Sequence, residues 1–293
     1  MVVIDDFVRT FSKDHEPCYR AKDGETVQFR TLDCYSGQVK TDADFPFDLD
    51  EETSDFATGL LYVEGAEPGD VLVVDILDVE VDPQGVCCAV GGPLVEDCEP
   101  RTKVIPIENR IATFNDFQWE VNPMIGVIGV APAGEEIACV QIGDHGGNMD
   151  SKVIKKGSRM YFPVQVSGGL LGMGDIHASM GDCELCGNGI EIAGNITVRV
   201  SVIKNFELHF PVTETPEKWY VNVARPEYEE ALKCACAEMQ RLIMNAYEWD
   251  KTDAFLYMSL QCDIEINQFT LPCPIYMCIR AGVPKIAGKA LVH

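Results

Sequence analysis

Residues 190–206 have the sequence IEIAGNITVRVSVIKNF, in which apolar and polar side chains alternate along most of the stretch. A period of two places successive side chains on opposite faces of a β-strand. Gly194 interrupts the alternation where a bend or bulge fits. The stretch therefore predicts a strand with one face buried in a sheet. On the buried face we expect Ile190, Ile192, Ile196, Val198, Val200, Val202 and Phe206, and on the other face Glu191, Asn195, Thr197, Arg199 and Ser201.

The same alternation recurs from residue 25 to about residue 223, between short clusters of Gly, Pro, Asn and Asp. Many short strands separated by turn residues are typical of a β-sandwich, whereas βαβ units would place a helix between successive strands. We therefore predict a mostly β fold that is sandwich-like, with antiparallel or mixed sheets. The clearest additional strands are expected at residues 26–30, 71–77, 125–130 and 160–166.

A small α+β part is expected toward the C-terminal end. Pro226 suits the first position of a helix, the glutamates after it complement the positive end of the helix dipole, and an apolar stripe continues to Ala246. A second helix is predicted at about 252–262, followed by strands at 263–267 and 275–279.

The length of 293 residues, with 46% hydrophobic and 24% charged side chains, is enough for one large or two ordinary globular domains. We divide the chain into a β-rich core at residues 1–223, which would contain the candidate metal site, and an α+β segment at residues 224–293 packed on the same core. A single domain over residues 1–293 is the alternative.

The net charge of −24 excludes some classes of partner. A protein this acidic repels phosphate backbones and anionic lipid surfaces, so we expect neither a nucleic-acid nor a membrane partner. The excess carboxylates would keep the protein in solution, or a buried subset of them would converge on a cation. Composition alone does not separate these two explanations.

The thirteen cysteines do not resemble the framework of a secreted disulfide-rich protein, which is usually short and has an even number of cysteines. The start MVVIDDFVRT has no signal-peptide pattern, and no apolar segment reaches the ~20 residues that a membrane-spanning helix needs. We therefore predict a cytoplasmic protein with reduced thiols. The single Cys-x-x-Cys pair, Cys183 and Cys186, has no second pair at zinc-finger spacing.

Residues able to bind a metal are concentrated between positions 143 and 191. Asp175 and His177 are two positions apart on a strand-like segment, so both would project to one side and offer an oxygen and a nitrogen to one cation. The neighbouring Leu171 and Met173 indicate that this segment is buried, where an unpaired carboxylate is costly. A divalent cation bound by Asp175 and His177 would remove that cost.

Four more residues are candidates for the same site. Asp182 and Glu184 repeat the spacing of two after a glycine turn, and His145 and Asp150 lie on either side of the glycine pair at 146–147. Other interpretations remain open. Asp182 and Glu184 could form a solvated acidic turn, and His145 alone is more typical of a hydrogen-bonded packing residue.

Three motifs resemble the acetamidase/formamidase family: GGNMD at 146–150, GSRMYFPV at 157–164 and GDIHA at 174–178. The similarity continues through GETVQFRTLDC at 24–34 and PMIGVIGVAP at 123–132, and it covers nearly the whole chain. The resemblance implies a β-rich fold, a divalent metal near the Asp-x-His segment, and hydrolysis of short amides to a carboxylate and ammonia.

The chain departs from the family pattern at two positions. The family usually has His-Ala-Ala-Gln-Gly-Asp-Gly-Glu, whereas residues 177–184 are HASMGDCE, so Met180 replaces a glutamine and Cys183 a glycine. The carboxylates Asp182 and Glu184 are kept. The loss of the glutamine amide removes a donor and an acceptor, and the cysteine adds bulk and a soft metal ligand. These changes bear on the substrate, the metal and the activity itself.

The expected function is metal-dependent hydrolysis of a small amide. A bound cation polarises the carbonyl and makes water nucleophilic at neutral pH. We expect Asp175 and His177 to be ligands of this cation, with His145 and Asp150 as further ligands. Zinc is the expected ion, and calcium is the alternative.

Four residues are predicted to assist the reaction. Glu184 is the candidate base, which would take a proton from water and return it to the leaving nitrogen. Asp182 would orient a ligand or bind a second cation. Asp33 is a further candidate for the same pocket, and Asn148 is expected to contact the substrate.

Two other functions are weighed against this one. The first is a non-catalytic cation-binding or scaffold protein on the same fold, in which Met180 and Cys183 mark lost activity. The second is an amidase with a cysteine nucleophile, although nothing in the sequence marks one thiol as activated. In each case the partner would be a small molecule or ion, and we expect a homo-oligomer of two or more subunits.

Overall fold

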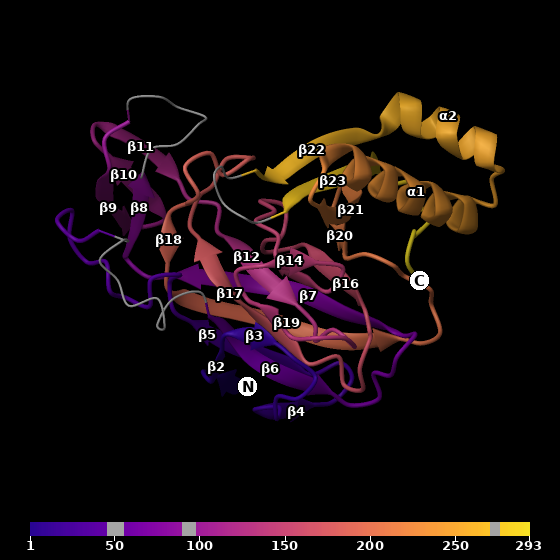
Figure 1. Cartoon of the computed structure of the whole chain (residues 1–293), viewed down its shortest axis with the longest axis horizontal. Coiled ribbons are helices and arrows are strands. Elements are labelled where there is room, and N and C mark those ends of the chain that lie inside the picture. The colour runs from indigo at the N-terminus through magenta and orange to yellow at the C-terminus, as the bar shows by residue number, and fades with distance from the viewer. Residues whose placement is uncertain (46–55, 90–97, 270–275) are drawn as a thin grey trace.

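The structure, a computed structural model, describes residues 1–45, 56–89, 98–269 and 276–293. Most regular structure in these residues is strand, and the two helices among them, α1 (Tyr228–Tyr247) and α2 (Lys251–Gln261), follow one another near the C-terminal end (Figure 1). The predicted mostly β fold is confirmed.

The first sheet contains nine of the described strands and is antiparallel except where β1 pairs with β5. Its longest pairing joins β19 to β7, and β5 lies on the other side of β19. In sheet order the strands are β1 (Val2–Ile4), β5 (Thr26–Thr31), β19 (Gly194–Ile203), β7 (Val71–Val81), β16 (Arg159–Pro163), β20 (Val212–Glu214), β21 (Lys218–Arg225), β23 (Met277–Pro284) and β22 (Asp263–Gln268).

The second sheet contains twelve of the described strands and is antiparallel except where β4 pairs with β6. Its main path is β11 (Phe117–Glu120), β10 (Ile111–Phe114), β9 (Arg101–Glu108), β8 (Gln84–Ala89), β18 (Glu191–Ile192), β17 (Leu171–His177), β12 (Met124–Gly129), β15 (Gly146–Asn148) and β14 (Ile142–Gly143). Off this path, β6 (Ala57–Val63) pairs with β17, β2 (Phe7–Val8) and β4 (Tyr19–Ala21), and a separate pair joins β3 (Thr10–Phe11) to β13 (Ile137–Ala138).

The two sheets pack face to face, as expected for a sandwich. Their facing side chains form one hydrophobic core, which includes Ile125 and Ile128 of β12 and residues such as Ile196 and Val198 of β19. The arrangement is visible in Figure 1, where β12 and β17 cross β7 and β19. Burial of these side chains is the main force that holds the layers together.

The predicted strand at 190–206 is divided between the two sheets. Residues 191–192 form β18 in the second sheet, and β19 begins at Gly194 in the first sheet. The chain thus changes sheet at the glycine where a bend was expected. Ile190 and Ile192 join the hydrophobic core as expected, but the face that carries Glu191 is buried too, because β18 lies between β17 and β8 and only 2% of Glu191 is exposed. Phe206 lies beyond the end of β19.

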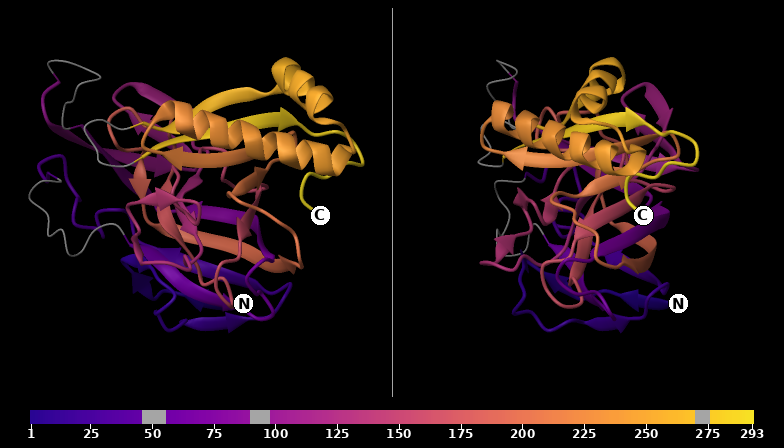
Figure 2. Two further views of the ribbon diagram at one scale, coloured as in Figure 1. Left: turned by 45° about the vertical axis from the view of Figure 1, so that its right-hand side comes forward. Right: turned by 90° about the vertical axis from the view of Figure 1, so that its right-hand side faces the viewer.

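The C-terminal part extends the first sheet. Strand β21 crosses the proposed boundary at residue 223 and pairs with β20 on one side and β23 on the other. Helix α1 covers one face of these strands (Figure 2), and its residues Ala235, Met239 and Leu242 are buried against that face.

The observed bounds of two strands of the first sheet and of helix α1 differ slightly from the predicted ones. The strand expected at 160–166 ends at Pro163, and the strand expected at 275–279 begins at Met277, with residue 275 outside the described residues. Pro226 is not in the first turn of α1, because Glu227 is extended and is the N-cap. Among the described residues, neither helix is long and apolar enough to cross a membrane.

Candidate metal and catalytic site

Five ionisable side chains meet in the interior, and we call them the acidic cluster: Asp150, Asp175, His177, Glu184 and Glu191. Strand β17 supplies Asp175 and His177, β18 supplies Glu191, Asp150 follows β15, and Glu184 lies in the loop after β17. All are buried except Asp175, whose side chain is 13% exposed.

His177 is at the centre of the acidic cluster. Its Nε2 atom lies 3.1 Å from Glu191 Oε1, 3.5 Å from Asp175 Oδ1 and 3.8 Å from Asp150 Oδ1. Glu191 is near because it pairs directly with His177 across the antiparallel strands β17 and β18. On the other side of the ring, Nδ1 lies 3.2 Å from the sulfur of Met180. The predicted proximity of Asp175 and His177 is thus present.

Gly126 of β12 provides the space that the carboxylates occupy. A methyl group at this position would lie 2.5 Å from Asp150 Oδ1 and 2.6 Å from Asp175 Oδ2. Asp175 opposes Gly126 with a φ of 51°, an irregular conformation for a strand residue. A residue without a side chain is therefore required on β12 for Asp150 and Asp175 to converge.

Gln268, at the end of β22, connects the acidic cluster to the first sheet. Its Nε2 atom donates to Glu184 Oε2 at 3.0 Å and also to Asp150 Oδ2. The loop that carries Glu184 is held at the same point, because the amide of Cys183 donates to the carbonyl of Asn267 at 3.0 Å. The candidate site therefore lies where the end of β22, in the first sheet, contacts the loop after β17, in the second sheet. We call this place the seam.

Burial and mutual repulsion shift the pKa values of the acidic cluster. Burial raises the pKa of Glu184 to about 7 and that of Glu191 to about 8, and it raises the pKa of Asp150 well above its usual range. Burial opposes the charge on His177, but Glu191 and Asp175 outweigh it and raise the pKa of the imidazole well above its ordinary value. The acidic cluster therefore holds protons when no other cation is present.

The atoms of the acidic cluster fit a metal ion. Two groups have ligand atoms within 4.8 Å of one another, Asp150 with His177 and Glu184, and Cys34 with Asp175 and Glu191. The oxygen atoms Asp150 Oδ1, Asp175 Oδ1 and Glu191 Oε2 are buried and have no hydrogen-bond partner among the described residues. Buried oxygens of this kind are costly unless they bind a proton or a cation.

Asp182 and Asp33 were expected at the site, and the structure gives each of them other contacts. Asp182 forms ion pairs with Lys152 at 2.7 Å and Arg280 at 2.9 Å, so it does not join Glu184 in the acidic cluster. The carboxylate of Asp33 accepts from the backbone amide of Tyr35 at 2.9 Å and stabilises a turn.

His145 and Asn148 also lie outside the acidic cluster. His145 packs against Phe11 with ring centroids 5.1 Å apart and belongs to neither group of ligand atoms. Asn148 of β15 pairs with Val127, next to Gly126, and its Oδ1 atom is buried without a hydrogen-bond partner among the described residues. Their roles as ligand and substrate contact remain predictions.

Sequence reasoning missed Glu191, Cys34 and Gln268. Glu191 was missed because both faces of β18 are buried: Ile190 and Ile192 join the hydrophobic core, and Glu191, on the opposite face, is 2% exposed. Gln268 gave no signal, since its partners Glu184 and Asp150 are 84 and 118 positions away.

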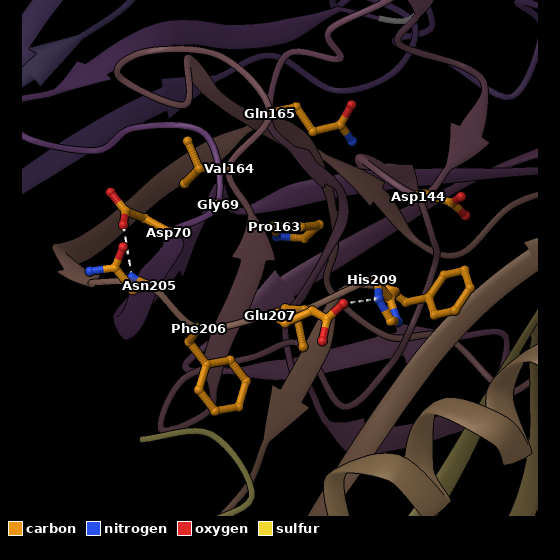
Figure 3. A pocket seen from close by; sticks show the side chains of 12 residues that line it. Gly69, Asp70, Asp144, Pro163, Val164, Gln165, Asn205, Phe206, Glu207 and His209 are labelled. Carbon is orange, nitrogen blue, oxygen red and sulfur yellow. Dashed lines mark hydrogen bonds and ion pairs between the residues drawn. The ribbon is translucent and has the colours of Figure 1, made fainter.

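An open pocket of about 720 Å³ lies elsewhere on the molecule (Figure 3). No member of the acidic cluster lines it. Two of its polar side chains, Glu207 and His209, contact each other at 3.2 Å, and Asp144 forms an ion pair with Arg225 outside the lining. The lining residues are Gly69, Asp70, Asp144, Pro163, Val164, Gln165, Asn205, Phe206, Glu207, Leu208, His209 and Phe210.

Comparisons with known proteins agree with this architecture. The sequence profile of the Acetamidase/Formamidase family matches residues 7–139 and 132–268. A formamidase of Methylophilus methylotrophus is 31% identical over 63% of this chain and 61% of its own length, and an acetamidase of Mycolicibacterium smegmatis is 28% identical over 58% of each. The chain thus spans about three fifths of the length of these curated relatives.

A solved structure is similar over almost its whole length. The crystal structure of an acetamidase from Bacillus halodurans superposes with a TM-score of 0.92 and 34% identity, and the alignment covers 96% of this chain and 97% of that one. The similarity therefore includes both sheets and the C-terminal helices.

Proposed function

The chain belongs to the acetamidase/formamidase family, and from this premise we propose that it hydrolyses a short amide to a carboxylate and ammonia with the help of a divalent cation. The observation that carries the proposal is the acidic cluster, in which three buried carboxylate oxygens around one imidazole have no hydrogen-bond partner in the part of the chain that the structure describes. Electrostatic interactions with a cation are stronger in such a site than in water.

Asp150, Asp175 and His177 are the proposed ligands of the cation. A bound cation would polarise the amide carbonyl and lower the pKa of a water molecule. A nitrogen donor together with carboxylate oxygens favours zinc, whereas calcium would require six to eight oxygen ligands. Zinc is therefore the expected ion, and calcium the alternative.

Glu184 is the proposed general base. Burial raises its pKa to about 7, which is close to the value at which a carboxylate can both accept and return a proton near neutral pH. It would take a proton from the attacking water and deliver it to the leaving nitrogen. The hydrogen bond from Gln268 at 3.0 Å orients Glu184 for this transfer.

Three further residues are proposed to support the reaction or to set its specificity. The Oδ1 atom of Asn148, which has no hydrogen-bond partner among the residues that the structure describes, can accept a hydrogen bond from the N–H of an amide substrate. Asp182 is proposed as a positioning residue. It forms an ion pair with Arg280, and Arg280 donates a hydrogen bond of 2.6 Å to Asn267, the residue before Gln268. Met180 contributes an apolar thioether next to His177, which favours an acyl group larger than that of formamide.

The test of the mechanism is ammonia release by the wild type and by Glu184→Gln. The amide keeps the shape of the side chain but cannot act as a base, so turnover should fall on the order of 10²-fold or more while the metal content stays unchanged. Glu108→Gln, at the exposed end of β9, is the control and should keep wild-type activity. Full activity of Glu184→Gln would assign the base to another residue.

The same assay separates the enzyme from a non-catalytic cation-binding protein. Formamide, acetamide, propionamide and a bulkier amide are each tested before and after treatment with a chelator. An enzyme of the proposed kind loses ammonia release with the chelator and regains it with zinc. Metal binding without turnover of any amide would favour the non-catalytic alternative.

A further inference from the structure

We infer that the acidic cluster takes a second cation, held by the thiolate of Cys34 together with the carboxylates of Asp175 and Glu191. The inference rests on the proposed function, because it places this second ion beside the first and shares Asp175 with it. The chemical class of the ligand is a divalent transition metal of intermediate softness, such as zinc or cobalt, since a thiolate binds calcium and magnesium poorly.

Two strands and one turn supply the ligands of the second position. Asp175 is in β17, Glu191 is in β18, and Cys34 follows β5 of the other sheet. One ligand atom of each lies within 4.8 Å of the others, a distance that one ion can bridge after small side-chain adjustments. Glu191 is 2% exposed, and its Oε2 atom has no hydrogen-bond partner among the described residues.

The turn that carries Cys34 is stabilised before any ion binds. The carboxylate of Asp33 accepts from the backbone amides of Tyr35, at 2.9 Å, and Gly37, at 3.1 Å. These bonds fix the backbone on both sides of Cys34. Asp33, which the sequence predicts in the pocket, instead holds the turn that brings the neighbouring Cys34 thiol to the acidic cluster.

The charge of the acidic cluster supports two ions. It contains four carboxylates, and among the described residues no lysine or arginine forms an ion pair with any of them; His177 is the basic group in contact. One divalent cation would leave two negative charges uncompensated in a buried site. Two divalent cations would balance the charge of the four carboxylates. With the Cys34 thiolate included, the net charge of the ions and these ligands would be −1.

The experiment uses Co²⁺ as the probe of the metal-free full-length protein. A thiolate bound to Co²⁺ gives a charge-transfer band in the near ultraviolet, which nitrogen and oxygen ligands do not give. The wild type should bind about two Co²⁺ per chain and show this band, because Cys34 supplies one sulfur ligand. Cys34→Ser should bind about one Co²⁺ per chain and lose the band.

The controls separate this inference from the proposed function. Cys236→Ser removes a half-buried thiol on α1 and should retain both ions and the band. Cys34→Ala, with its melting temperature, reports whether a loss of cobalt in Cys34→Ser reflects unfolding. One Co²⁺ per chain without the band in the wild type, or an unchanged band in Cys34→Ser, would overturn the second position and leave the first intact. A wild type that binds no Co²⁺ would overturn both.

Discussion

His145 combines deep burial with an ionisable ring. Only 1% of the residue is exposed, and neither ring nitrogen has a hydrogen-bond partner among the described residues. Burial lowers the pKa of His145 from 6.5 to about 4. The folded protein thus keeps this imidazole neutral at pH values where the unfolded chain protonates it.

This difference predicts a pH-dependent loss of stability. Between pH 6.5 and pH 4 the unfolded state binds the additional proton, so the free energy of unfolding falls as the pH decreases, by about 3 kcal/mol for this residue. Urea unfolding of the wild type and of His145→Leu at pH 7 and pH 4 measures the contribution. The variant should lose about 3 kcal/mol less than the wild type over that range. Equal losses in the two proteins would contradict the prediction.

Single residues also show what the sequence could provide. The spacing of Asp175 and His177 predicted correctly that they lie together, because two positions on a strand share a face. Alternation did not reveal the burial of Glu191, since β18 lies between two other strands and is buried on both faces. Cys34 could not be distinguished from the other twelve cysteines, because only tertiary packing brings its thiol to the acidic cluster.

Strand β12 is the element on which the acidic cluster depends most directly. At Gly126, even the smallest side chain would overlap with Asp150, Asp175 and the backbone of Asp175. We expect Gly126→Ala to displace both carboxylates and to lower amide turnover by on the order of 10²-fold. The added methyl group should also reduce the free energy of unfolding by about 1–3 kcal/mol.

Gly134→Ala is the matched control for this substitution. At Gly134, no atom of the described residues lies within 4 Å of the position that a methyl group would occupy. Turnover and metal content should therefore be unchanged in the control and reduced in Gly126→Ala. Wild-type turnover in both variants would show that the carboxylates need not lie where the structure has them.

The strands at the seam explain why the sequence identified only part of the candidate site. Alternation predicted β5, β7 and β12 within a few residues, because each is buried on at least one face. The position of β22 beside the loop of Glu184 depends on the order of strands in the first sheet, and alternation contains no information about that order. The sequence therefore could not predict that Gln268 belongs to the candidate site.

The whole molecule should respond to removal of the cation. Without it, four carboxylates remain together in the interior, and burial raises the pKa of Glu184 and Glu191. A cation present at about 1,000 times its Kd would stabilise the folded state by about 4 kcal/mol, which corresponds to a rise of about 10 °C in Tm. Calorimetry with and without a chelator measures this difference.

A matched variant tests whether the effect comes from the acidic cluster. Asp175→Asn combined with Glu191→Gln removes two of the four charges and should melt at the same temperature with and without the chelator. Zinc added back should restore the Tm of the wild type only. The proposal of a cation in the acidic cluster fails if the chelator leaves the Tm of the wild type unchanged.

The hydrogen bonds of Gln268 join segments separated by 84 and 118 positions. Contacts between such distant segments close long loops of chain, and they form late during folding. A nascent or refolding chain would therefore reach its transition state before the ligands of the cation have converged. An ion bound at the seam would slow unfolding and leave the rate of folding unchanged, so its contribution to stability would be measured as a longer lifetime of the folded protein.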